Sequence, residues 1–105
     1  DYDLYCAVPV SISQAALGAT ITIKSLDDRS IDVKVPAGTQ NGKILRIKGE
    51  GINSANGRKG DLYIKLMVQV PTKLTPAQKK ILESYLAEEK PSDSPDLIPL
   101  SNLSR

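Results

Sequence analysis

Alternation of apolar and polar residues is the clearest pattern in this chain of 105 residues. After Asp61, every second side chain from residue 62 to residue 70 is apolar, which is the period of a strand with one buried face. Shorter alternating runs occupy residues 4–10, 19–23, 31–35 and 45–47. The pattern therefore predicts about five strands, and their core must be aliphatic because the only aromatic residues are four tyrosines.

Two segments are expected to be helical. Residues 13–17 are Ala-rich, begin with a residue type that caps helices and stop at Gly18. A longer helix is predicted from Thr75, whose hydroxyl can cap a free N–H, through Pro76 to about Lys90. Its apolar side chains form one stripe, consisting of Ile81, Leu82, Tyr85 and Leu86. That stripe can pack on the chain's own sheet or on a second molecule, and the residues alone leave both open.

Turn-forming residues separate the strands. The run L-D-D-R-S suits a hairpin loop, while Pro36 with Gly38 and the pair Asn41-Gly42 supply preset and positive φ values. Residues 50–59 are rich in Gly and Asn and are expected to form a surface loop. Adjacent strands should therefore be antiparallel. We expect a mainly β fold, a small antiparallel two-sheet sandwich with a short helix after the first strand and a C-terminal amphipathic helix.

The chain is long enough for one small core. We expect a β-rich domain over residues 1–74, a helix over 75–90, and a Ser- and Pro-rich tail over 91–105. The tail is either disordered or laid across a hydrophobic groove. Because the chain begins inside a strand pattern, it is expected to be a piece of a longer protein. It has neither a signal-peptide pattern nor an apolar run of the ~20 residues that a membrane span needs, so we expect a cytoplasmic protein without membrane contact.

Candidate catalytic residues are few. The chain has no His, which excludes Ser-His, Cys-His and imidazole-metal sites. Asp27 and Asp28 could be paired carboxylates, but adjacent residues in a hairpin loop point apart, so a turn is the favoured interpretation. Cys6 shares the alternation of Leu4 and Val8, which predicts a small core residue and not a reactive thiol. No enzyme activity is expected.

A nucleic-acid-binding β-module is the alternative function. Basic residues gather around the glycine-rich loops, at Lys43, Arg46, Lys48, Arg58 and Lys59. However, the net charge is only +2, and no aromatic residue lies between Val33 and Asp61 to stack on a base. A solvated strand face is therefore the favoured interpretation, and nucleic acid is an unlikely partner.

The glycine-rich segment carries a resemblance to a known family. Six of the seven glycines lie between residues 35 and 62, five of them within P-A-G-T-Q-N-G, R-I-K-G-E-G and G-D-L-Y. The runs D-L-Y at the start, A-A-L-G before the second strand and L-T-P-A-Q-K-K-I-L at the last helix agree in order and spacing. Over residues 3 to about 88, the chain resembles the C-terminal substrate-binding region of DnaJ-type heat-shock co-chaperones.

The resemblance implies the second of two β-rich subdomains, which carries the dimerisation element. Such a homodimer holds unfolded client proteins for a DnaK-type ATPase, which is addressed through a J domain absent from this chain. The piece itself needs no cofactor, since it lacks Cys-x-x-Cys repeats, and zinc is expected elsewhere in the full-length family member. The expected dimer interface is Ile81, Leu82, Tyr85, Leu86, Leu97, Ile98 and Leu100. The expected client-binding groove, secondary to one in the preceding subdomain, is Val8, Val10, Ile21 and Ile23.

Overall fold

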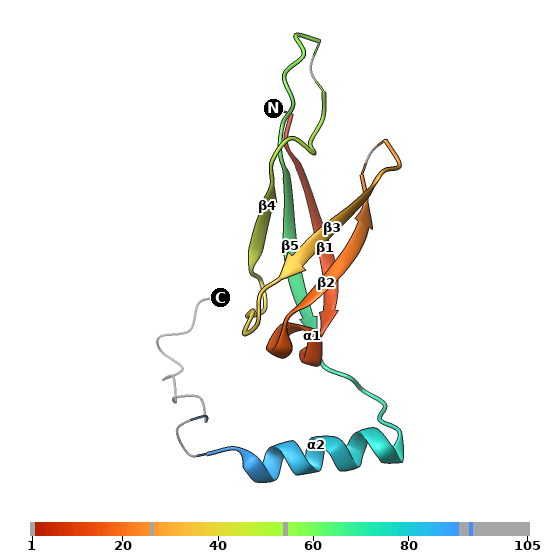
Figure 1. Cartoon of the computed structure of the whole chain (residues 1–105), viewed down its shortest axis with the longest axis vertical. Coiled ribbons are helices and arrows are strands. Elements are labelled where there is room, and N and C mark those ends of the chain that lie inside the picture. Colours follow the sequence, from red (N-terminus) through yellow and green to blue (C-terminus); the bar gives the residue numbers. More distant parts are fainter. Residues whose placement is uncertain (1, 26, 54, 91–92, 94–105) are drawn as a thin grey trace, which may run out of the picture. The chain divides into compact units, whose positions relative to one another are not determined.

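The computed structural model describes residues 2–25, 27–53, 55–90 and 93 (Figure 1). Its elements follow in the order β1 (Leu4–Ser11), α1 (Ile12–Leu17), β2 (Ala19–Lys24), β3 (Ser30–Val35), β4 (Ile44–Ile47), β5 (Leu62–Gln69) and α2 (Pro76–Glu88). The chain divides into two compact units, Asp1–Pro71 and Thr72–Arg105. The predicted mainly β fold with two small sheets, a short helix after the first strand and a C-terminal helix is confirmed.

The strands form a three-stranded sheet, in the order β1-β5-β4, and a two-stranded sheet of β2 and β3. β2 pairs with β3 and β4 pairs with β5 in antiparallel fashion, as the turns between them predict. β1, however, pairs with β5 in parallel, from Leu4 opposite Leu62 to Ser11 opposite Gln69. The three-stranded sheet is therefore mixed, and the expectation of a wholly antiparallel sandwich was wrong at this pair. A turn fixes the direction of strands that it joins, but β1 and β5 lie far apart in the sequence.

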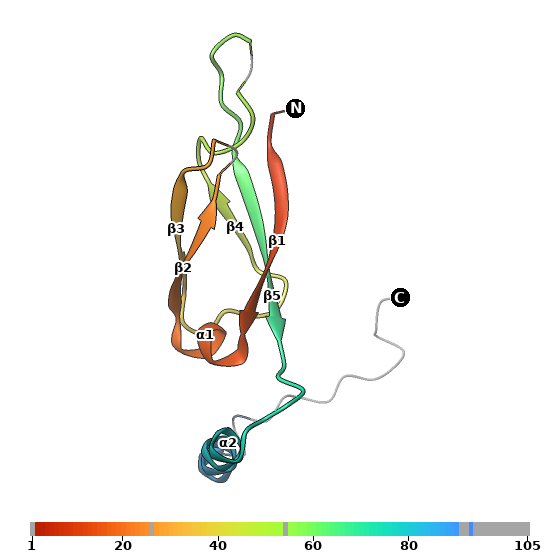
Figure 2. The ribbon, with the colours of Figure 1, turned by 90° about the vertical axis from the view of Figure 1, so that its right-hand side faces the viewer.

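The core of the first unit lies between the two sheets, and α1 covers one end of it (Figure 2). Its buried members among the described residues are Val10, Ala15, Val33, Val35, Leu62, Ile64 and Leu66. β5, the central strand of its sheet, supplies Ile64 and Leu66, which have no exposed surface. Removing each such side chain from water stabilises the fold by about 1.5–3 kcal/mol. The predicted alternation ends earlier than expected, since Val70 lies beyond β5 and is 74% exposed.

The short helix α1 is capped at both ends. Its N-cap is Ser11, two residues before the capping residue expected from the sequence. The Ser11 hydroxyl accepts a hydrogen bond from the Gln14 N–H at 3.1 Å, and the Gln14 side chain accepts one from the Ser11 N–H at 2.9 Å. At the other end, Gly18 has a φ of +86°, which the L residues rarely adopt. The first cap satisfies an N–H group and the second, through the Gly18 N–H, the carbonyl of Gln14, which a six-residue helix would otherwise leave free.

The P-A-G-T-Q-N-G segment ties α1 and the two sheets together. The N–H groups of Gly38 and Thr39 both donate to the Ala15 carbonyl, at 2.8 and 2.9 Å, so this turn closes the C-terminal end of α1. Asn41 then accepts a hydrogen bond from the Val68 N–H at 2.8 Å. The order of turn residues in this segment therefore has a structural role, because Gly38, Thr39 and Asn41 bond to neighbouring elements.

α2 begins as the sequence predicts. Thr75 is the N-cap, its hydroxyl accepts from the Gln78 N–H at 3.1 Å, and Pro76 occupies the start of the helix. The helix ends at Glu88, two residues before the predicted end at Lys90, and none of its residues is buried. No helix in the described part of the chain is both long enough and apolar enough to cross a lipid bilayer.

Two glycines allow the start of the chain to pack against the loop between β4 and β5. The Ile52 N–H in this loop donates to the Tyr2 carbonyl at 2.7 Å. A Cβ atom built at Gly51 would lie 2.5 Å from the Tyr2 carbonyl oxygen, and one at Gly60 would overlap the same carbonyl. Both contacts are with backbone atoms, so a side chain could not be accommodated by a change of rotamer.

Substitution of Gly60 by Ala is expected to destabilise the fold by about 3 kcal/mol, because the added methyl group forces two backbone segments apart. The matched control is Gly38→Ala, where φ is +80° but nothing lies within 4 Å of the new Cβ. This control should lower the free energy of unfolding by only about 1 kcal/mol, which is the strain of placing an L residue in the left-handed backbone conformation. Urea unfolding of both variants measures the difference. Equal stability of the two variants would contradict the close approach at Gly60.

Candidate functional site

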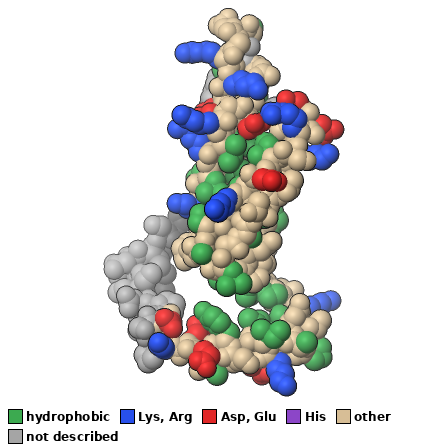
Figure 3. Space-filling model, in the orientation of Figure 1, with side chains coloured by type: hydrophobic (Ala, Val, Ile, Leu, Met, Phe, Trp, Pro, Cys, Tyr) green, Lys and Arg blue, Asp and Glu red, His purple; other side chains and the backbone are tan. Residues whose placement is uncertain are grey.

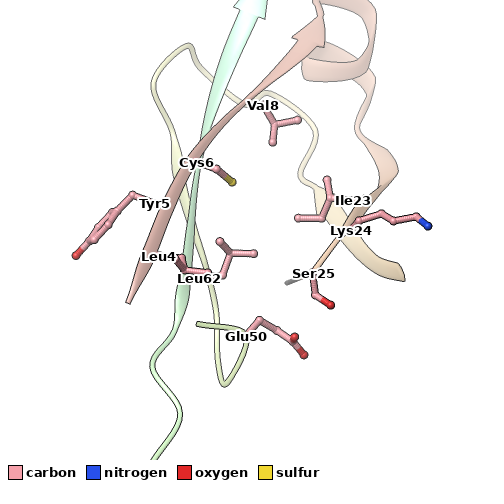
Figure 4. A pocket seen from close by; sticks show the side chains of 9 residues that line it. All are labelled: Leu4, Tyr5, Cys6, Val8, Ile23, Lys24, Ser25, Glu50 and Leu62. Carbon is pink, nitrogen blue, oxygen red and sulfur yellow. The ribbon is translucent and has the colours of Figure 1, made fainter. Parts of the chain in front are cut away.

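A pocket opens beside the first strand of the three-stranded sheet (Figure 4). Its volume of about 240 Å³ is below the roughly 300–1,000 Å³ of small-molecule sites. Its apolar lining consists of Leu4, Cys6, Val8, Ile23 and Leu62. Lys24, Ser25 and Glu50 add a polar rim, and Tyr5 borders the pocket with its ring directed away from the other side chains. The pocket is thus suited to one or two aliphatic side chains of a larger ligand.

Strand geometry explains why these side chains converge. Successive side chains of a strand alternate between its faces, so Leu4, Cys6 and Val8 share the face of β1 that looks toward Ile23 of β2 (Figure 4). The parallel register then places Leu62 opposite Leu4. β1 pairs only with β5 and β2 only with β3 within the described residues, so both strands that line the pocket have a free edge.

Cys6 is exposed in this pocket, and its prediction as a core residue was wrong. The alternation identified its face of β1 correctly, since Val10 on the same face is 2% exposed. The sequence does not indicate how far along β1 this face is covered by the rest of the fold. The core closes over Val10, whereas the part of the face around Cys6 borders the open pocket.

The structure separates the four residues that the sequence suggested for client binding. Val8 and Ile23 line the pocket. Val10 belongs to the buried core, and Ile21 is half-buried and packs against that core. Sequence reasoning missed Leu4 and Cys6, although they share the alternation of Val8. It also missed Leu62, which only the parallel register of β1 and β5 brings to the site.

An ion pair holds Glu50, which belongs to the polar rim of the pocket. The Arg29 guanidinium donates to the Glu50 carboxylate at 2.8 Å, and its Nε donates to Asp27 at 3.2 Å. Arg29 follows the turn after β2, while Glu50 lies in the loop after β4, so the bridge connects the two sheets at their loop ends. Asp28 has a φ of +63° in the same turn, which confirms the turn interpretation of the two adjacent aspartates.

A second ion pair holds the base of the loop that carries Glu50. The Asp61 carboxylate accepts from the Gly49 N–H at 3.0 Å and from the Arg46 Nε at 2.7 Å. The Gly49 N–H and then the Arg46 guanidinium hold the pKa of this carboxyl below its ordinary value of 3.8. Asp61, whose side chain is only 16% exposed, thereby joins the end of β4 to the start of β5. The R-x-x-G-x-G and G-D-L motifs meet at this carboxylate.

The apolar stripe of α2 is available for contact with a partner. Ile81, Tyr85 and Leu86 are 68%, 64% and 67% exposed, and Leu82 is half-buried. Figure 3 shows green, apolar surface along α2. The other residues expected at a dimer interface, Leu97, Ile98 and Leu100, lie outside the residues that the structure describes.

The basic side chains gain no support as a nucleic-acid site. Charged groups of both signs gather at the loop end of the first unit (Figure 3). Arg46 is neutralised by Asp61 at 2.6 Å, which leaves the strand face with fewer free cations than the sequence suggested. Nothing in the described structure supports the alternative of a nucleic-acid-binding module.

Replacement of Asp61 by Asn should weaken the fold most at neutral pH. Because the pKa of this carboxyl is lower in the folded chain than in the unfolded chain, its stabilisation is present above 3.8 and disappears as the pH falls through the folded value. The difference in urea midpoint between wild type and D61N should therefore shrink below pH 3.8. When Arg46 is also replaced by Gln, the effect of D61N on the urea midpoint should be smaller, since one of the two residues that donate to the Asp61 carboxylate has been lost. A difference that is constant with pH would refute this assignment.

Known proteins similar to this chain come from one family. The sequence profile of the DnaJ C terminal domain matches residues 1–71. The Chaperone protein DnaJ of Treponema denticola is 57% identical over 101 residues, which cover 96% of this chain and 27% of that protein. The proteins of the same name from Xylella fastidiosa and Protochlamydia amoebophila are 45% and 40% identical, over 79% and 89% of this chain and 23% and 24% of their own lengths. The chain spans about a quarter of these relatives and belongs to the DnaJ C terminal domain family.

Proposed function

We propose that this chain is a client-holding and dimerisation domain of a DnaJ-type co-chaperone, corresponding to the second β-rich subdomain. The observation that carries the proposal is the open apolar pocket between two strands with free edges. The family to which the chain belongs and the names of its relatives support a chaperone role. The domain acts through binding and geometry, without a reaction of its own.

The free edge of β1 gives a physical mode of client binding. An unpaired strand edge presents N–H and C=O groups with which an extended segment can pair, whatever its sequence. A segment paired in this way directs alternate side chains toward one face, and an aliphatic side chain can then enter the pocket beside Cys6 and Ile23. Backbone pairing combined with one small apolar pocket would favour unfolded chains over folded ones, because only unfolded chains offer free extended backbone.

Dimerisation through α2 would strengthen this weak contact. Three of the four stripe residues, Ile81, Tyr85 and Leu86, are exposed, and two copies of such a stripe can bury each other in a symmetric interface. A dimer then presents two pockets to one client, which raises the effective concentration of the second site without any new contact. We place this assembly in the cytoplasm, where a J domain elsewhere in the full-length protein would deliver the client to a DnaK-type ATPase.

A charge in the pocket should weaken client binding. Cys6→Glu places a carboxylate where a client side chain would have to remove it from water, and we expect a loss of affinity of about tenfold. The fold should persist, because Cys6 is exposed. Fluorescence anisotropy with a labelled, permanently unfolded carboxymethylated protein measures the affinity. Cys6→Ser and Thr20→Glu, which adds the same charge on an exposed position of β2, should bind as wild type does. Unchanged binding by Cys6→Glu would exclude the pocket as a client site.

Charges on the α2 stripe should dissociate the dimer. Leu82→Asp with Tyr85→Asp removes two side chains whose burial is worth about 1.5–3 kcal/mol each, in both copies. Analytical ultracentrifugation across a concentration series should show a dimer for wild type and a monomer for this variant, with unchanged circular dichroism. Ser84→Asp, placed off the stripe on the same helix, should remain a dimer. A monomeric wild type, or a variant that still dimerises, would reject the role of α2.

A further inference from the structure

The outer face of the three-stranded sheet, opposite the core, carries an ordered set of side chains. We define this outer face by three rows that follow from the strand registers. The first row is Tyr5, Tyr63 and Arg46, the second is Ala7, Lys65 and Ile44, and the third is Pro9 and Met67. Each of these side chains alternates along its strand with residues that face the core or the pocket, so the outer face points away from both.

Apolar and aromatic groups are unusually accessible on the outer face. Tyr5 is 70% exposed and Ile44 is 57% exposed. The rings of Tyr5 and Tyr63 are stacked, with centroids 5.1 Å apart and planes inclined by 12°, and Figure 4 shows the Tyr5 ring pointing away from the pocket. Stacking fixes the two rings in advance, which lowers the entropy lost when a partner covers them. Aromatic residues and Met are enriched, and acidic residues depleted, in the surfaces that proteins use for recognition.

The charge of the outer face has one sign. β1, β4 and β5 contain neither Asp nor Glu. Arg46 is neutralised by Asp61, with an N–O distance of 2.6 Å. Lys65 stands between Ala7 and Ile44 and forms no ion pair with any residue that the structure describes. The outer face is therefore an apolar and aromatic surface with one unpaired cation near its centre.

We infer that the outer face binds a short protein segment in which carboxylates alternate with apolar side chains. A carboxylate opposite Lys65 would pair the one cation of the outer face that has no ion pair among the described residues, while neighbouring apolar groups would cover Ile44 and the tyrosine pair. A single free cation is too few to neutralise the run of phosphates that a nucleic acid presents, which favours a peptide. This second contact surface lies on the opposite face of β1 from the apolar lining of the pocket, and the inference holds whether or not the pocket binds clients.

The test is a titration of the full chain, labelled with nitrogen-15, with two synthetic peptides followed by NMR. In one peptide Glu alternates with Leu, and in the other Lys replaces every Glu. The first should shift the amide signals of Tyr5, Tyr63 and Lys65 and bind more tightly than the second. Lys65→Glu should weaken the acidic peptide about tenfold and reverse the preference. Lys34→Glu, the same change on an exposed position of β3, should leave both affinities unchanged.

Several results would overturn the inference. These are the absence of shifts with the acidic peptide, shifts confined to the pocket at Leu4, Cys6 and Val8, equal binding of both peptides, or equal effects of Lys65→Glu and Lys34→Glu. A single-stranded oligonucleotide that shifts the outer face when the acidic peptide does not would overturn it as well. If Lys65→Glu unfolds the chain, Lys65→Gln must abolish the preference for the acidic peptide, and a retained preference would count against the inference.

Discussion

The parallel pairing of β1 with β5 is the interaction on which the other features depend. These strands come first and last in the sequence but are neighbours in the sheet. They pair over their full length, from Leu4 opposite Leu62 to Ser11 opposite Gln69. β5 lies in the middle of its sheet and supplies Ile64 and Leu66, two residues without exposed surface, to the core. The same pairing leaves the other edge of β1 free, brings Leu62 to the pocket and stacks Tyr5 on Tyr63. Core, pocket and outer face therefore share one strand pair.

The glycine-rich motifs support this pairing. The turn at Gly38 and Thr39 bonds to the end of α1, and Asp61 connects the two ends of the β4–β5 loop through Arg46 and Gly49. Gly60 lets the chain start approach the loop closely. A family pattern made of such positions defines a scaffold, so it identifies the fold more securely than it identifies any ligand.

The sequence predicted the elements well because their signals are local. Alternation located five strands, and the T-P-A-Q start located α2 and its cap at Thr75. The pocket could be predicted only in part. Val8 and Ile23 were expected there and line it, but the burial of Val10 and the exposure of Cys6 depend on how far the two-stranded sheet extends over β1. The contribution of Leu62 depends on a long-range parallel register, which no local pattern encodes.

The alkylation rate of Cys6 tests the central claim most directly. This residue is the only cysteine of the chain and lies in the proposed client pocket, so the wild-type protein carries its own probe. A maleimide should modify Cys6 readily in the folded chain. An excess of a cysteine-free client protein in its unfolded form should slow the modification, whereas the same client in its folded form should not. A rate that is unaffected by the unfolded protein, or that rises only when the chain itself is denatured, would contradict the account.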